Sequence, residues 1–211
     1  MNWLLSLFTF IFLGACSGTY LEHSVHSEHQ ASQVRLDQQM MEAINRKLKE
    51  SAYSYRLTVK QSSQVQIFTG KQQGENWVIH EPKQKLEMER KGDRIWIHFA
   101  GKQEEMSTKQ AGLVSPRDHL LLIKEIAKAF HPLKTENNDR RYRVEIDQHK
   151  WLQKLKQRLY TKEETPLFDL SEKMRVDYQL LFSENGTKLK RVTLTIEGYD
   201  PDREQVLTYS F

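Results

Sequence analysis

Apolar and polar side chains alternate along most of this chain with a period of two, as in β-strands that bury one face and expose the other. The clearest run is Tyr53, Tyr55, Leu57 and Val59, which alternate with polar residues. The same period gives these further inward-facing residues: Val65, Ile67, Leu86, Met88, Ile95, Ile97, Phe99, Tyr142, Val144, Ile146, Met174, Val176, Tyr178, Leu180, Phe182, Leu194 and Ile196. Strands of this kind predict an antiparallel sheet that is covered on one side.

Short turn sequences separate the predicted strands. Glu184-Asn185-Gly186-Thr187 predicts a hairpin with a type I′ turn, because Asn-Gly readily adopts the positive φ angles that this turn requires. The stretch from Gly70 to Gly74 and the triplet Lys91-Gly92-Asp93 predict two further turns. Asp200-Pro201-Asp202 predicts another, before a last strand over residues 204–211.

A first helix is predicted over residues 31–50. Val34, Met41, Ile44 and Leu48 recur there at helical spacing and form one apolar stripe, which is typical of an amphipathic helix. We expect the stripe to pack on the core, and a helix lying on a membrane surface is the alternative.

Two more helices interrupt the strands. Ser115-Pro116 is typical of an N-cap and a first helical position, and we expect that helix to continue to Phe130 and to end before Pro132. Its apolar residues are Leu120, Leu121, Leu122, Ile123, Ile126, Ala127 and Phe130. Asp147 predicts the start of a third helix, which continues to about residue 160.

Composition limits the classes of protein that this chain can belong to. It has 211 residues, of which 38% are hydrophobic and 28% charged, a net charge of +4 and a single cysteine. The length suits one domain with accessory segments. Its longest apolar run, within residues 1–15, falls well short of the ~20 residues that cross a bilayer. A lone Cys16 excludes a disulfide scaffold and a cysteine-based zinc site.

Residues 1–15 are apolar and carry no charged side chain, which predicts a signal peptide. The segment Leu13-Gly14-Ala15-Cys16 that ends this run resembles the lipobox of bacterial lipoproteins. The resemblance implies cleavage between Ala15 and Cys16, and a lipid on Cys16 that anchors the protein to the extracytoplasmic face of the cell membrane. The outer membrane is the alternative if the cell is Gram-negative. A buried helix with an incidental cysteine is the alternative.

Residues 16–30 are polar and predict a flexible, lipidated tether between the anchor and the domain. His23, His26 and His29 recur there at a spacing of three, which on a helix would suit zinc or copper. We favour a plain linker, because no carboxylate or cysteine cluster accompanies them, and we expect no metal.

The order helix, strands, helix, strand, helix, strands predicts an α+β fold in which about three helices cover one face of a curved antiparallel sheet. Over residues 31–211 this layout resembles the half-barrel of LolA-like and LppX/LprG-type lipoproteins. The resemblance implies a single domain that encloses an apolar cavity and binds lipid or acyl chains without covalent chemistry. We expect the cavity to be lined by Tyr55, Leu57, Ile95, Ile97, Leu121, Ile126 and Phe130.

Catalytic motifs are missing from the sequence. It contains no G-x-S-x-G, H-E-x-x-H or phosphate-binding glycine loop, so we expect neither an enzyme nor a cofactor. Asp200 and Asp202 suit a turn, with a weak calcium site as the alternative. The basic pair Arg140-Arg141 suits a solvated face or anionic lipid headgroups, and we expect no nucleic acid.

Two functions from different classes remain open. The first is a lipid-anchored binding protein of the bacterial cell envelope that holds a hydrophobic ligand between sheet and helices. The second is a tethered module that binds a protein partner in envelope assembly, signalling or sporulation. A secreted hydrolase is a third, weaker candidate, because it needs a polar cluster that the linear sequence does not reveal.

Overall fold

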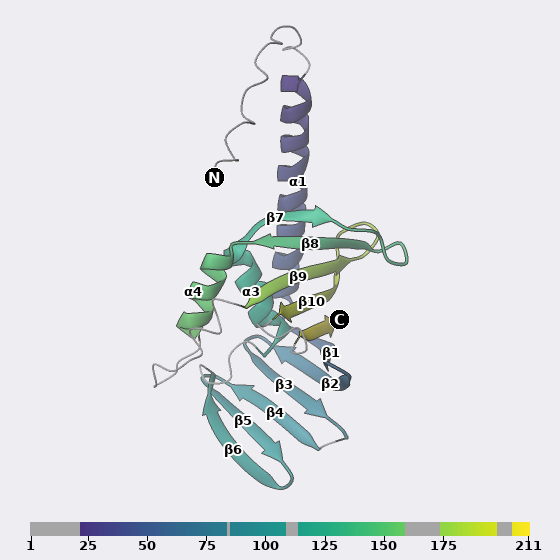
Figure 1. Ribbon diagram of the computed structural model, residues 1–211. Coiled ribbons are helices and arrows are strands. Elements are labelled where there is room, and N and C mark those ends of the chain that lie inside the picture. The colour runs from purple at the N-terminus through teal and green to yellow at the C-terminus, as the bar shows by residue number, and fades with distance from the viewer. Residues whose placement is uncertain (1–21, 84, 109–113, 159–173, 198–203) are drawn as a thin grey trace, which may run out of the picture.

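The structure of this protein is a computed structural model that describes residues 22–83, 85–108, 114–158, 174–197 and 204–211. The predicted lipobox and the predicted turn at Asp200-Pro201-Asp202 lie outside these ranges. The elements of Figure 1 are α1 (Glu22–Lys49), β1 (Ala52–Gln61), β2 (Gln64–Gln73), β3 (Asn76–Glu81), β4 (Leu86–Lys91), β5 (Arg94–Phe99), β6 (Lys102–Ser107), α3 (Pro116–Ile126), β7 (Ala127–Pro132), β8 (Arg140–Ile146), α4 (Gln148–Arg158), β9 (Arg175–Phe182), β10 (Leu189–Glu197) and β11 (Gln205–Ser210).

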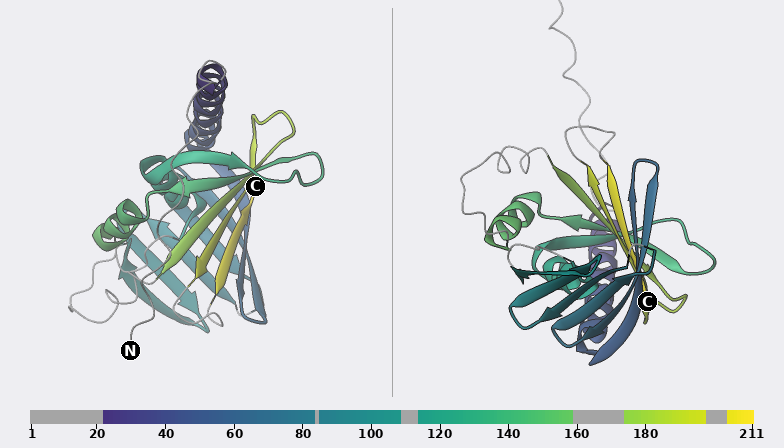
Figure 2. Two further views of the ribbon diagram at one scale, coloured as in Figure 1. Left: turned by 45° about the horizontal axis from the view of Figure 1, so that its top comes forward. Right: turned by 90° about the horizontal axis from the view of Figure 1, so that it is seen from below.

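All eleven of these strands belong to one antiparallel sheet in the order β6-β5-β4-β3-β2-β1-β11-β10-β9-β8-β7. The sheet consists of two meanders, β1–β6 and β7–β11, which meet where β1 pairs with β11. Its outer strands, β6 and β7, do not pair with each other in the described chain, so the curved sheet stays open (Figure 2). The predicted α+β half-barrel is confirmed.

Cross-strand register explains why one face of the sheet is apolar. Val144 lies opposite both Phe130 and Tyr178, and Tyr178 lies opposite Leu194. The row continues through Leu207 to Val59 on β1. Because directly opposed residues share a face, this register carries one apolar row across the centre of the sheet and confirms the period-two prediction there.

The prediction for Val65 and Ile67 was wrong. The β1–β2 hairpin pairs Gln61 with Gln64, so each odd-numbered residue of β1 faces an even-numbered residue of β2. Ile67 therefore lies opposite Thr58 on the outer face of the sheet. Val65 and Ile67 are 57% and 49% exposed, because register decides which set of alternating residues turns inward.

The first helix begins earlier than predicted. It starts at Glu22 instead of Ala31, so much of the segment expected to be a flexible tether is helical. Residues 22–30 contain neither glycine nor proline, so nothing in them interrupts a helix that the packed part nucleates. Of the predicted stripe, Ile44 is fully buried, Met41 and Leu48 pack against the core, and Val34 is 50% exposed.

The helix α3 begins as predicted but ends sooner. Ser115 is its N-cap, with a capping box to Asp118, and Pro116 occupies the first turn. The helix stops at Ile126, and the next residue, Ala127, has an extended backbone conformation. The Ile126 carbonyl accepts a hydrogen bond from the Asp147 amide. Residues 127–132 form β7 because they pair with β8, and the predicted helical position of Phe130 was therefore wrong.

Two of the predicted turns also differ in detail. In the loop from Ser183 to Lys188, Gly186 has a positive φ angle. The Asn185 side chain accepts hydrogen bonds from Ser183 and Thr187. The loop is thus longer than a two-residue type I′ turn. Strand β2 also continues through Gln73, so the predicted turn from Gly70 begins only at Gly74.

Candidate binding face

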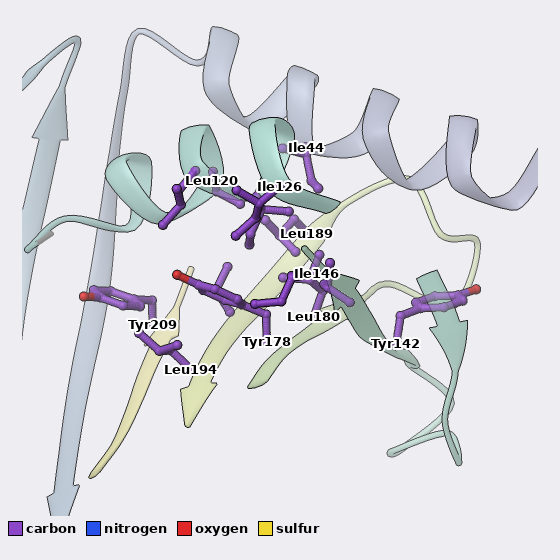
Figure 3. Close-up of a cluster of buried hydrophobic side chains, with 14 of the residues drawn as sticks. Ile44, Leu120, Ile126, Tyr142, Ile146, Tyr178, Leu180, Leu189, Leu194 and Tyr209 are labelled. Carbon is purple, nitrogen blue, oxygen red and sulfur yellow. The ribbon is translucent and has the colours of Figure 1, made fainter. Parts of the chain in front are cut away.

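The covered half of the concave face is apolar. We call Phe130, Val144, Tyr178, Leu180 and Leu194, with the helix side chains above them, the apolar zone. Phe130 is 1% exposed and Tyr178 0%. Figure 3 shows Leu120 and Ile126 of α3 and Ile44 of α1 above Tyr178, Leu180 and Leu189 of the sheet. Side chains from both layers, the helices and the sheet, are therefore buried together in this zone.

Helix α1 covers the edge strand β7 of this zone. The Asp37 carboxylate accepts a hydrogen bond from the Phe130 amide at 2.8 Å, and the Gln33 side chain donates to the Phe130 carbonyl at 3.0 Å. Gln33 also donates to Asp37 at 2.9 Å. The two side chains thus act as a backbone partner for β7, which keeps an edge strand from pairing with another chain.

Most of the predicted cavity residues lie in the core, but they differ in how far they are buried. Tyr55, Leu57, Ile95, Ile126 and Phe130 are buried, and Ile97 packs against them half-buried. Leu121 of α3 is half-buried and lies outside this cluster. That these residues line a cavity stays a prediction.

Strands β4–β6 form a wing that extends away from α1 (Figure 1). On its concave face Met88 lies opposite Ile97, and Ile95 lies opposite Met106. Ile95 is buried, whereas Met88, Ile97 and Met106 are half-buried and Phe99 at the tip is 49% exposed. The apolar face of the sheet therefore continues from the core to a margin that is only partly covered.

A row of polar side chains crosses the concave face of β1–β4, and we call it the polar row. Tyr53 lies opposite Gln72, Gln72 opposite Trp77, and Trp77 opposite Arg90. Tyr55 adjoins this row, with its ring centroid 6.4 Å from that of Tyr53. Sequence reasoning missed this row, although Trp77 and Ile79 are two residues apart, as inward-facing residues of a strand are. Gln72 is only 2% exposed, but because its side chain is polar, a search for alternating apolar residues does not find it.

The first turn of α3 closes the polar row. An Arg90 guanidinium nitrogen lies 3.7 Å from the Asp118 carboxylate, and both side chains are mostly buried. Arg117 donates a hydrogen bond of 2.7 Å to the Leu48 carbonyl, which fastens α3 to the end of α1. The packing of two helices therefore fixes the polar end of the concave face.

Four buried polar atoms at this end have no hydrogen-bond partner in the described chain. They are the hydroxyls of Tyr53 and Tyr55, Oε1 of Gln72 and Nε1 of Trp77. Buried polar atoms are normally satisfied. Burial raises the pKa of both tyrosines far above the usual range, and the Asp118 carboxylate acts in the same direction. These hydroxyls therefore stay neutral at physiological pH.

Three other polar groups connect the polar row to the apolar zone. His119 Nδ1 lies 3.0 Å from the Tyr178 hydroxyl, and the His119 ring packs on Tyr209 with centroids 5.3 Å apart. The Tyr209 hydroxyl donates to the Val114 carbonyl at 3.0 Å. Burial also raises the pKa of Tyr209. In contrast to the row beside them, these groups are hydrogen-bonded.

One surface groove of the described residues lies mainly on the outer face of the sheet. It has a volume of about 610 Å³ and is lined mainly by outward-facing polar residues of the first strands, among them Arg56, Lys71, His80 and Glu87. Within the described residues, no group of His, Cys, Asp or Glu could hold a metal ion. None of the helices in those ranges is long and apolar enough to cross a membrane.

The fold and this face define an open α+β half-barrel with an amphipathic concave side. No family model and no curated protein matches the sequence. Solved structures that are similar include LprF from Mycobacterium bovis, at 10% identity and a TM-score of 0.47, over 82% of this chain and 90% of that one. The lipoprotein LppX from Mycobacterium tuberculosis is similar at 8% identity and a TM-score of 0.44, over 82% and 93%.

A LolA superfamily protein from Nitrosomonas europaea is also similar, at 13% identity and a TM-score of 0.34, over 83% of this chain and 92% of that chain. The sequence predicted a likeness to these groups of proteins. At such low identities the likeness concerns the fold of the chain and not its function.

Proposed function

We propose that this protein is a non-enzymatic, lipid-anchored binding protein of a bacterial cell envelope that holds a hydrophobic ligand against the concave face. The observation that carries this proposal is the half-covered apolar margin of Met88, Ile97 and Met106, which continues a buried apolar face. Methionines suit such a surface, because their flexible thioethers adapt to ligands of varied shape. The partly covered margin is where an acyl chain would enter.

The anchor is the second part of the proposal. The lipobox Leu13-Gly14-Ala15-Cys16 supports attachment of two or three acyl chains to Cys16, which suffices for stable membrane binding. Anchoring would keep the concave face close to a source of lipid.

The ligand is tested on the full chain with two single variants of β5. Ile97→Asp places a charge on the concave face, whereas His98→Asp places it on the outer face of the same strand as a matched control. Native mass spectrometry of detergent-solubilised protein is expected to find a lipid adduct on the parent and on His98→Asp but not on Ile97→Asp. Equal adducts on all three, or an adduct-free parent, would overturn the proposed site.

Anchoring has a separate test. Cells that express the parent are expected to incorporate labelled fatty acid into the protein, and Cys16→Ala is expected to abolish the label and to leave a heavier precursor. A labelled Cys16→Ala chain would place the lipid elsewhere, and an unlabelled parent would exclude the anchor.

A protein partner is the second candidate, and it is favoured by the exposed side chains of Val65 and Ile67 on the outer face of β2. Exposed neighbouring apolar residues mark docking surfaces more often than isolated ones do. Val65→Lys with Ile67→Lys is expected to abolish crosslinks to a specific partner in whole cells. Crosslinks that survive in the double variant would refute this surface.

A further inference from the structure

The polar row is a continuous surface, because its members occupy directly opposed positions on four neighbouring strands. Tyr53, Gln72, Trp77 and Arg90 follow one another from β1 to β4, and side chains at such positions lie within contact of one another. Tyr55 extends the surface by one step along β1. The row lies on the same face of the sheet as Ile95 and Met106, since Arg90 lies opposite Ile95.

The orientation of Gln72 is fixed by its own hydrogen bonds. Its amide nitrogen donates to the carbonyls of Gly74 and Asn76, at 3.0 and 3.1 Å. The carbonyl oxygen Oε1 is therefore held as an acceptor with no partner of its own in the described chain. Gln72, Tyr55 and Trp77 are 2%, 5% and 3% exposed, so each atom left unpaired lowers the stability of the unliganded protein.

The four unpartnered atoms define the chemistry of a matching ligand. Trp77 Nε1 only donates, Gln72 Oε1 only accepts, and the hydroxyls of Tyr53 and Tyr55 do both. A complementary group must offer several acceptors and at least one donor. Of the cations nearby, Arg90 is paired with Asp118 and Lys47 with Glu50, and Arg117 donates to the Leu48 carbonyl. Because burying a further charge is costly, an uncharged group is the better match for this buried site.

We propose that Tyr53, Tyr55, Gln72 and Trp77 form the polar end of the ligand site and bind an acyl ester that carries a free hydroxyl, as in a monoacylglycerol. The ester carbonyl accepts from Trp77 and a tyrosine, and the ligand hydroxyl donates to Gln72. This inference rests on the proposed function, in which the acyl chain lies along Met88, Ile97 and Met106. Polar groups beside an apolar face are the usual way for a pocket to orient an amphipathic ligand.

The test compares two probes with the same chain length on the full, detergent-solubilised protein: 1-oleoylglycerol and the hydrocarbon 1-octadecene. Binding is measured from the rise in unfolding temperature with probe concentration. The parent is expected to bind the glyceride at least tenfold more tightly than the hydrocarbon, and Tyr53→Phe with Tyr55→Phe is expected to remove about tenfold of that preference. Tyr142→Phe on β8 is the matched control and is expected to leave the preference unchanged.

Stability without ligand provides an independent readout. Tyr55→Phe is expected to keep or raise the unfolding temperature, because the Tyr55 hydroxyl has no hydrogen-bond partner within the described ranges. Tyr209→Phe is expected to lower it by breaking the bond to the Val114 carbonyl. A lowered temperature for Tyr55→Phe, or equal affinity of the parent for both probes, would overturn the polar end. Oleate is measured as a third, charged probe in the same assay, and tighter binding of oleate than of the glyceride would also overturn it. Binding of neither probe would instead overturn the proposed function itself.

Discussion

The apolar zone and the polar row lie on the same concave face yet differ in how fully their groups are paired and covered. In the apolar zone, Tyr178 and Leu180 are 0% exposed beneath α1 and α3. In the polar row, four buried polar atoms have no hydrogen-bond partner among the described residues, and Met88, Ile97 and Met106 of the neighbouring wing are half-buried. One region therefore stabilises the fold, and the other gives up stability where a ligand would bind, as expected when function breaks local rules of packing.

The two edges of the sheet repeat this contrast. Strand β7 is capped by Asp37 and Gln33 of α1, whereas β6 is mostly exposed and carries Lys102, Glu104 and Glu105. Charged side chains on an open edge disfavour pairing with another strand. Side chains of α1 therefore bind the sheet edge at β7, whereas charged side chains protect the sheet edge at β6.

Leucine truncations should give the largest difference between the two regions. Leu180→Ala in the apolar zone is expected to destabilise by about 2–5 kcal/mol, because a fully buried side chain leaves a cavity. Leu86→Ala in the wing removes the same atoms from a half-buried site and is expected to cost less than half as much. Denaturant unfolding measures both, and equal losses would show that the wing is packed as tightly as the core.

Gly70→Ala should disturb strand β2 beside the polar row, where the Tyr55 ring lies over Gly70. A Cβ at Gly70 would overlap the Tyr55 ring, and displacing that ring is expected to cost about 1–3 kcal/mol. Thermal unfolding tests this loss. In a Tyr55→Ala background the same substitution should cost little, because the obstructing ring is gone, and a cost that persists there would point to the backbone instead.

The capped edge can be opened with one substitution. Asp37→Ala leaves the Phe130 amide without its acceptor, which is expected to destabilise by about 1–3 kcal/mol and to speed amide exchange in β7. Asp37→Asn keeps an acceptor oxygen and is the matched control, expected to lose much less. Unchanged exchange at Phe130 in the alanine variant would mean that α1 does not hold this edge.

How much of this could be predicted from sequence depends on whether a feature is local. Alternation from Val176 to Phe182 and the cap at Ser115 are local signals, and both predicted the fold correctly. Residues 127–132 look like a helical continuation, and only pairing with β8 makes them a strand. The inward set of β2 depends on hairpin register, so Ile67 was misassigned and Gln72 overlooked. The Arg90–Asp118 contact joins elements far apart in sequence, which no local pattern reveals.

The last and smallest effect concerns the tyrosines of the polar end. Because burial raises the pKa of Tyr55 in the folded state, its neutral form contributes stability that is fully present below the ordinary value near 10. That stability declines above this value, where the unfolded chain ionises first. The loss is about 1.4 kcal/mol per pH unit for one such group. Tyr55→Phe should therefore lose less stability between pH 9 and 11 than the parent, in denaturant unfolding. If Tyr55→Phe followed the parent, the Tyr55 hydroxyl would be hydrated, and the contrast between the two regions would rest on packing alone.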